Sequence, residues 1–178
     1  DPIQTLNNLE SYDIIVLWQV IEHLLNPVAA LQTIVQHLRP GGVLVFSAPN
    51  PSSLQFWLFG RLWAHLDAPR HLNLIPIPVL QQVLEELGMR RLAITTRDGE
   101  ADKMNRYGWK KSLMNVLGVQ VSPLTVPVTT DVAPRPLTYR VKRGALRLVA
   151  GMIELLATPF ERSGQQGSSY TFIFQKPG

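Results

Sequence analysis

Two histidines and one glutamate are the residues of this chain whose types and positions could do chemistry. Glu22 and His23 follow directly after a short apolar run, and His71 lies further along the chain. An imidazole with an ordinary pKa near ~6.5 can act as a general base at neutral pH. His23 or His71 could therefore take a proton from a reacting group, with Glu22 converging on the same ligand. The structural alternative is that Glu22 and His23 cap the following helix and that His71 only hydrogen-bonds within a loop.

A strand, a helix and a second strand are expected to position the first two of these side chains. Residues 12–18 are apolar and β-branched without alternation, which indicates a strand buried on both faces. Asn26 and Pro27 are typical of a helix start, and the Arg-Pro-Gly-Gly of residues 39–42 ends that helix. Residues 43–48 predict a second buried strand. The segment is therefore expected to form a right-handed parallel crossover, which predicts an α/β fold.

The loops after these strands hold the candidate ligand-binding residues. Ligands of open parallel sheets bind beyond the carboxyl ends of the strands. Gln19, Glu22 and His23 lie just past the first such end, and Asn50 lies past the second. The four aromatic residues that follow could cover an apolar substrate or could pack in the core; they are Phe56, Trp57, Phe59 and Trp63.

The second half of the chain predicts a helix, two strands and a long insertion between those strands. Residues 78–87 form an amphipathic pattern closed by Gly88, residues 91–96 predict a third strand, and residues 170–175 predict a fourth. The insertion, residues 97–169, is too long for a simple connection, and we expect a lid or a substrate-side subdomain.

Within the insertion, an extended part precedes a helix. Four prolines in residues 119–138 indicate extended or looped backbone. Residues 140–158 predict a helix that is apolar around nearly its whole circumference, with Arg147, Gly151 and Glu154 as its polar stripe. The apolar stretch is shorter than the ~20 residues of a membrane span. The helix is therefore either buried or in contact with a membrane surface. The basic Arg140, Lys142 and Arg143 just before it point to the surface, but most such helices pack against the protein, so a buried helix is the expectation.

Composition and charge restrict the class of protein. Apolar residues make up 46% of the 178 residues and charged residues 17%, which is typical of a globular domain. There is no cysteine, so disulfides and thiolate metal sites are excluded. Residues 1–89 carry 3 basic and 7 acidic side chains, net −4, whereas residues 90–178 carry 14 and 6, net +8. No nucleic acid partner is expected, because the basic residues are not interleaved with aromatic residues in a binding motif.

Four motifs in order give the chain a resemblance to a known family. Residues 12–27 run from a hydrophobic strand into Glu-His and then Asn-Pro; Leu-Arg-Pro-Gly-Gly follows at 38–42, Pro-Asn at 49–50 and Pro-Arg-His at 69–71. This series resembles class I S-adenosylmethionine-dependent methyltransferases of the ubiquinone-biosynthesis type. Residues 78–96 are similar more loosely, and residues 97–169 only vaguely.

The resemblance implies a fold and a cofactor. The family has a Rossmann-like sheet, and this chain would supply its C-terminal half, strands 4-5-7-6, as a single partial domain over residues 1–178. S-adenosylmethionine would be the cofactor of the intact enzyme. However, the glycine-rich loop that holds it in the family has no counterpart, because none of the 12 glycines forms Gly-Xaa-Gly. Asp1 rather than methionine begins the chain, without a signal peptide pattern, and we expect a cytoplasmic fragment that is inactive alone.

The resemblance also assigns residue roles. Asp1, Trp18 and Gln19 would contact the cofactor. Glu22, His23 and His71 would be catalytic. The chain is also similar to small-RNA 2′-O-methyltransferases, in which a Glu-x-x-Glu-His motif and a distant histidine hold a divalent cation. This similarity implies that Glu22, His23 and His71 could bind a metal ion. Here Gln19 replaces the first carboxylate, which lowers the negative charge of the site.

The expected reaction is methyl transfer to a small molecule, most simply O-methylation of an apolar or quinone-like acceptor. A sugar or polyketide acceptor is the rival substrate, and Asn50, Trp63 and Arg70 are the candidate substrate-binding residues. A non-catalytic interaction domain, docking through the basic and apolar insertion, is the rival class. Strand 12–18 would lack its family neighbour and become an edge, so self-association through it is expected.

Overall fold

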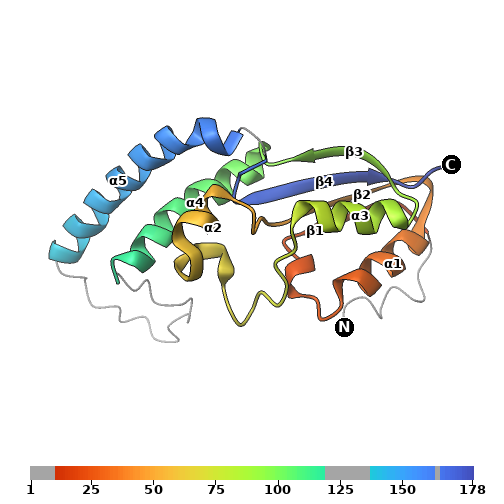
Figure 1. Ribbon diagram of the computed structural model, residues 1–178, viewed down its shortest axis with the longest axis horizontal. Helices are drawn as coiled ribbons and strands as arrows, with labels where there is room; N and C mark the ends of the chain where they lie inside the picture. The colour runs from red at the N-terminus through yellow and green to blue at the C-terminus, as the bar shows by residue number, and fades with distance from the viewer. Residues whose placement is uncertain (1–10, 119–136, 163–164) are drawn as a thin grey trace.

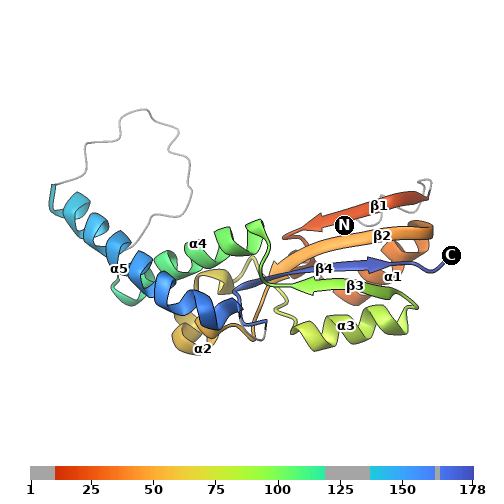
Figure 2. The ribbon, with the colours of Figure 1, turned by 90° about the horizontal axis from the view of Figure 1, so that it is seen from above.

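The computed structural model describes residues 11–118, 137–162 and 165–178 (Figure 1). Within them, a four-stranded sheet carries helices on one face and a helical extension at one end (Figure 1, Figure 2). The regular elements, in chain order, are β1 Tyr12–Trp18, η2 Ile21–His23, α1 Pro27–His37, β2 Leu38–Pro49, α2 Leu54–Phe59, η3 Gly60–Leu62, η4 Ala64–Leu66, α3 Ile77–Glu86, β3 Arg90–Thr95, α4 Gly99–Val116, α5 Leu137–Arg162 and β4 Ser169–Gln175.

The expected strand–helix–strand unit is present, with local causes at both ends of its helix. The side chain of Asn26 accepts a hydrogen bond from Ala29 N at 3.0 Å, and Pro27 occupies the first turn. The helix ends at His37, and the following Pro-Gly-Gly already runs along the sheet as the start of β2. Gly41 lies inside β2 with φ of 79°, a conformation that costs glycine little, where the register with β1 shifts.

The strand order is β1-β2-β4-β3. β1 pairs in parallel with β2, while β4 pairs antiparallel with both β2 and β3. This is the 4-5-7-6 order expected from the family resemblance, and it confirms the α/β, Rossmann-like half-sheet. Within the described residues, β1 is an edge strand.

The core lies on a single face of the sheet. Alternate residues of β2 and β4, including Phe46 and Phe172, pack with residues of α1 and α3 such as Leu31 and Leu84 in one buried cluster. The intervening side chains of each strand point to the opposite face of the sheet.

The expectation that strand 12–18 is buried on both faces is wrong for the described residues. Ile14 is 62% exposed and Val16 is 56% exposed, whereas Ile15 and Leu17 pack against the core. Successive side chains of a strand point to opposite faces, and α1 and α3 cover only one of them. An uninterrupted apolar run cannot show which of its faces is covered.

The insertion is more helical than its sequence suggested. α4 spans residues for which no helix was expected, and the side chain of Asp98 caps it by accepting from Glu100 N and Ala101 N. α5 is longer than the expected 140–158 and begins at Leu137, so the last two residues of the expected extended part are helical. The rest of that part, 119–136, lies outside the described residues.

α4 and α5 pack against each other and extend away from the end of the sheet where β2 stops (Figure 1, Figure 2). In the described part of the chain, no helix combines the length and apolar character needed to cross a membrane.

Candidate functional site

The candidate site lies beyond the carboxyl ends of β1 and β2, where the sequence placed it. Gln19 leaves β1 in the left-handed region, with φ of 51°, and its backbone N donates to Ser47 O at 3.1 Å. Its side-chain Nε2 donates to Ser47 Oγ at 3.1 Å and to Ser169 Oγ at 3.2 Å. The Gln19 side chain therefore ties three strands together, beside the turn that carries Glu22 and His23.

Backbone hydrogen bonds bring the Pro-Arg-His segment to this turn. Leu72 N and Asn73 N both donate to Glu22 O, at 2.8 and 3.1 Å. The Asn73 side chain donates to Leu24 O at 2.6 Å. These bonds fix the loop after Pro69 against η2, and they place His71 beside Glu22 and His23.

The three side chains converge on one point. Nε2 of His23 and Nε2 of His71 each lie 4.0 Å from Glu22 Oε1. The two imidazole rings meet edge to face, with centroids 4.7 Å apart. The structure thus joins the adjacent Glu-His pair with the distant histidine.

The hydrogen bonds of the two histidines determine which ring nitrogen is free. His23 Nδ1 is 2.8 Å from Arg70 O, and His71 Nδ1 is 2.7 Å from His65 O. A carbonyl oxygen only accepts hydrogen bonds, so each neutral ring carries its proton on Nδ1. Both Nε2 atoms therefore keep a lone pair, and both are turned toward the Glu22 carboxylate.

The electrostatics of the site favour a neutral His71 ring and a destabilised Glu22 carboxylate. Glu22 is 1% exposed, and neither carboxylate oxygen has a hydrogen-bonding partner among the described residues. Burial raises the pKa of Glu22, an effect that its own backbone N–H and the nearby His23 partly oppose. Burial likewise lowers the pKa of His71, against the hydrogen bond to His65 O. A neutral imidazole beside an unsatisfied buried carboxylate is an arrangement that can accept a proton.

The capping alternative for Glu22 and His23 is wrong. Asn26, not either of these residues, caps α1, and the Glu22 carboxylate makes no hydrogen bond within the part of the chain that the structure describes. The other half of that alternative is observed, since His71 does hydrogen-bond within its loop through Nδ1. That bond leaves Nε2 available for chemistry.

The side chains of the other expected site residues are not part of the Glu22, His23 and His71 cluster within the described residues. Trp18 ends β1 with its side chain partly exposed, and Asp1 lies outside the described residues. Asn50 is buried and donates to Gln165 O and Gly167 O, which joins the loops at the ends of β2 and β4. Arg70 is exposed and paired with Asp67 at 2.6 Å.

The aromatic cluster is divided between core and surface. Trp63 is buried against Phe56, with ring centroids 5.2 Å apart, and Phe59 packs on Trp109 of α4. Trp57 is exposed. Core packing therefore accounts for three of the four rings, and Trp63 offers a substrate almost no accessible surface.

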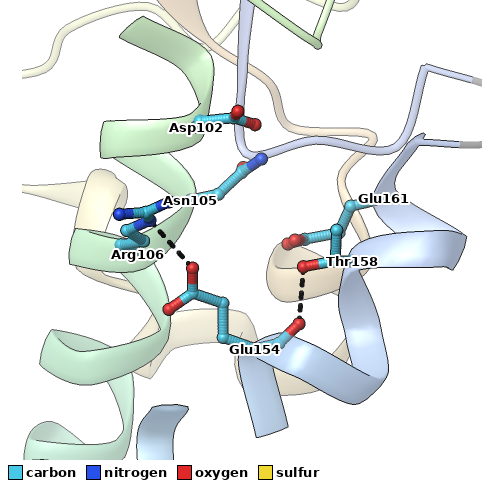
Figure 3. Close-up of a pocket in the computed structure, with 6 residues that line it drawn as sticks. All are labelled: Asp102, Asn105, Arg106, Glu154, Thr158 and Glu161. Carbon is cyan, nitrogen blue, oxygen red and sulfur yellow. Dashed lines mark hydrogen bonds and ion pairs between the residues drawn. The ribbon is translucent and has the colours of Figure 1, made fainter. Parts of the chain in front are cut away.

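A second buried carboxylate escaped the sequence analysis. Glu161 of α5 accepts from Gln55 Nε2 at 2.8 Å and from Trp109 Nε1 at 2.9 Å. Burial raises its pKa, and these two donors oppose the rise. It borders a small cavity of about 40 Å³ between α4 and α5; the other lining residues are Asp102, Asn105, Arg106, Glu154 and Thr158 (Figure 3). An Arg106–Glu154 ion pair of 3.0 Å closes one side. A glutamate near the end of a helix gave no sequence signal for this network.

Three comparisons bear on the identity of this fold and site. A family model described as a methyltransferase domain matches residues 1–93. A ubiquinone biosynthesis O-methyltransferase of Rickettsia prowazekii (strain Madrid E) is 34% identical over 62 residues, which are 35% of this chain and 24% of that protein. A crystal structure of a SAM dependent methyltransferase from Archaeoglobus fulgidus superposes with a TM-score of 0.50 at 21% identity, covering 99% of this chain and 65% of that one.

The chain spans less than two thirds of each of these two proteins. The structural likeness shows the fold, and the family model covers the segment that holds β1, Glu22, His23 and His71. With the strand order and the four motifs, these findings agree on one identity: the chain belongs to the class I methyltransferase-domain family.

Proposed function

We propose that the enzyme containing this domain transfers the methyl group of S-adenosylmethionine to a hydroxyl of a small apolar, quinone-like acceptor. The convergence of Glu22, His23 and His71 carries the proposal, because methyl transfer to a hydroxyl needs a base and little other side-chain chemistry. The name of the Rickettsia relative supports oxygen as the methylated atom.

The reaction is a displacement in which His71 accepts a proton. The hydroxyl oxygen forms a bond to the methyl carbon while the bond from that carbon to sulfur breaks. The hydroxyl proton moves to Nε2 of His71, the nitrogen that its Nδ1 bond to His65 O leaves free. Glu22 Oε1, 4.0 Å from that nitrogen, stabilises the imidazolium that forms. The products are the methyl ether and S-adenosylhomocysteine.

S-adenosylmethionine supplies an activated methyl group, and the described residues fit part of its site. Trp18 offers accessible aromatic surface at the carboxyl end of β1, where ligands of such sheets bind, and Gln19 follows it. These two residues would border the methionine part of the cofactor. The chain has no Gly-Xaa-Gly, so the backbone donors of a glycine-rich loop are not among the contacts it can supply.

Histidine variants test this assignment. They are made in the full protein that the gene encodes. His71→Ala and His23→Ala should each lower turnover roughly 10²–10⁴-fold if the residue is a general base, with little change in cofactor affinity. His37→Ala is the matched control, because His37 also bonds a carbonyl through Nδ1, to Thr33 O at 2.8 Å, but lies on α1. Normal turnover by both site variants would contradict the base assignment. Absence of methyl transfer in the unmodified protein would favour the interaction-domain alternative.

A divalent cation is the second candidate occupant of the same three residues. Glu22, His23 and His71 each offer a ligand atom, and these atoms lie within 4.8 Å of one another. Metal-binding histidines commonly donate their other N–H to a carbonyl, as both do here. One carboxylate and two imidazoles would leave open positions, and the cation would lower the pKa of a bound hydroxyl.

Chelation distinguishes the two candidates. If a cation is required, chelator should abolish turnover, a divalent metal should restore it, and Glu22→Gln should lower the bound metal found by elemental analysis. If His71 acts as the base alone, chelator should leave turnover unchanged and purified wild type should contain no stoichiometric metal.

A further inference from the structure

α5 packs on the rest of the molecule through one narrow stripe. Leu146, Ala150, Ala157 and Glu161 are its buried side chains, at helical spacing, and they face α4 and α2. This stripe holds the Glu161 network and little apolar surface. The helix forms an outer layer beside α4 and runs from the far end of the helical extension back toward the sheet (Figure 1, Figure 2).

The opposite side of α5 is apolar and exposed. Leu148 is 73% exposed, Leu155 is 75% exposed and Leu156 is 73% exposed. Met152 is more than half exposed on the same face, at i+4 from Leu148. A surface helix of a globular protein normally shows the reverse arrangement, with its apolar side inward. A contiguous exposed apolar face of this kind indicates contact with another surface.

The N-terminal half of α5 is basic. Residues 137–147 contain four lysines and arginines and no acidic residue. Arg147 of α5 is exposed, and the sequence puts Arg140, Lys142 and Arg143 in the first turns of the same helix. Basic residues beside an apolar helical face are complementary to a lipid surface that carries negative charge.

The acidic residues of α5 are not available to a basic partner. Glu154 is paired with Arg106, and Glu161 is buried with Gln55 and Trp109. A second copy of α5 would therefore bring like charges together without an acidic counterpart on the exposed face. This charge distribution favours an anionic membrane over self-pairing as the occupant.

We propose that α5 lies flat on an anionic membrane surface, with Leu148, Met152 and Leu155 at the acyl boundary and Arg147 among the headgroups. The contact is peripheral, in keeping with a described chain whose helices are too short or too polar to span the bilayer. The inference rests on α5 alone and does not depend on the proposed chemistry at Glu22, His23 and His71.

Co-sedimentation with vesicles tests the proposal. The purified chain should bind vesicles of phosphatidylcholine and phosphatidylglycerol, and raising the salt concentration should weaken that binding. A Leu148→Gln and Leu155→Gln double variant should bind at least about tenfold more weakly for each leucine removed. Leu58→Gln with Leu92→Gln is the control, because these leucines are about half exposed but lie on α2 and β3. That variant should bind like wild type.

Three results would overturn the proposal. Equal binding to vesicles of phosphatidylcholine alone would refute the anionic surface. Unchanged vesicle binding by the α5 double variant would place the contact elsewhere. If wild type binds no vesicles but sediments as a dimer that the α5 double variant disrupts, a second copy and not a lipid surface covers the helix. A circular dichroism spectrum identical to that of wild type shows that the variant is folded.

Discussion

Glu22 Oε1 and His71 Nε2 lie 4.0 Å apart, and neither atom has a hydrogen-bonding partner among the described residues. The separation is too long for a hydrogen bond and short enough for the carboxylate to stabilise a charged ring. Because both side chains are largely buried, that interaction is weakly screened by water. The pair therefore favours proton acceptance by His71.

The pH dependence of turnover should show a base with a lowered pKa. Burial lowers the pKa of His71, so the neutral, proton-accepting ring persists below the usual value of ~6.5. Activity should rise with pH as His71 loses its proton, with a midpoint below ~6.5, and should be constant above it. A pH profile of kcat/KM in the protein as its gene encodes it measures this limb. A midpoint above the usual histidine value, or the same limb in His71→Ala, would contradict the assignment.

The 178-residue chain should show no measurable S-adenosylmethionine binding by calorimetry. Twelve glycines are present but none forms Gly-Xaa-Gly, so the close backbone approach that the family uses is lacking. Micromolar binding by this chain would show that the cofactor contacts lie elsewhere than the family resemblance implies.

Glu161→Gln should stabilise the fold, and more so at higher pH. Burial raises the pKa of Glu161 in the folded state above its unfolded value, so folded protein binds more protons between the two values. Wild type therefore loses stability as pH rises through the folded pKa, and the glutamine variant does not. Each tenfold change in the ionisation constant corresponds to about 1.4 kcal/mol.

Thermal unfolding at a series of pH values measures that difference. Glu86→Gln is the control, since Glu86 is exposed on α3 and should show no growing advantage. If the stability difference between Glu161→Gln and wild type stays constant with pH, folding does not raise the pKa of Glu161.

Gly108→Ala should destabilise the helical extension by about 1–3 kcal/mol through overpacking. A Cβ at Gly108 would collide with Gln55 Oε1 and lie 3.0 Å from His65 Nε2. Gln55 cannot easily move, because it is buried and donates to Asn105 O and Glu161 Oε1. Urea unfolding measures the change.

Gly151→Ala is the matched control on α5, where an added Cβ meets nothing within 4 Å. It should stabilise by about 0.5–1 kcal/mol, since alanine is the better helix former. Equal stability of the Gly108→Ala and Gly151→Ala variants would mean that the Gln55 side chain does not require a glycine at position 108.

The edge strand β1 should make the chain self-associate at micromolar concentration. One side of β1 is unpaired in the described residues, and its exposed face carries Ile14 and Val16 without charge or proline. Val16→Lys should shift sedimentation toward monomer. Val28→Lys, on an exposed apolar position of α1, should not. A wild-type chain that sediments as a clean monomer would refute the pairing.

The sequence by itself determined the local elements of this protein and the identity of its reactive residues. An apolar β-branched run predicts β1, and Asn26 with Pro27 starts α1, because these preferences act within a few residues. The motif series added the strand order, through family resemblance and not through periodicity. Glu22 and His23 were identifiable because their side chains follow the carboxyl end of a strand.

Only the tertiary structure decided how distant residues meet and which apolar faces stay open. His71 reaches Glu22 because Leu72 N and Asn73 N bond to Glu22 O. Such backbone hydrogen bonds do not depend on side-chain type, so the sequence does not reveal them. Periodicity showed an apolar helix at 140–158 but not that Leu148 and Leu155 face outward while Glu161 faces α4. That choice depends on a long-range contact, the bond of Glu161 to Gln55 and Trp109, which lie far from it in the chain.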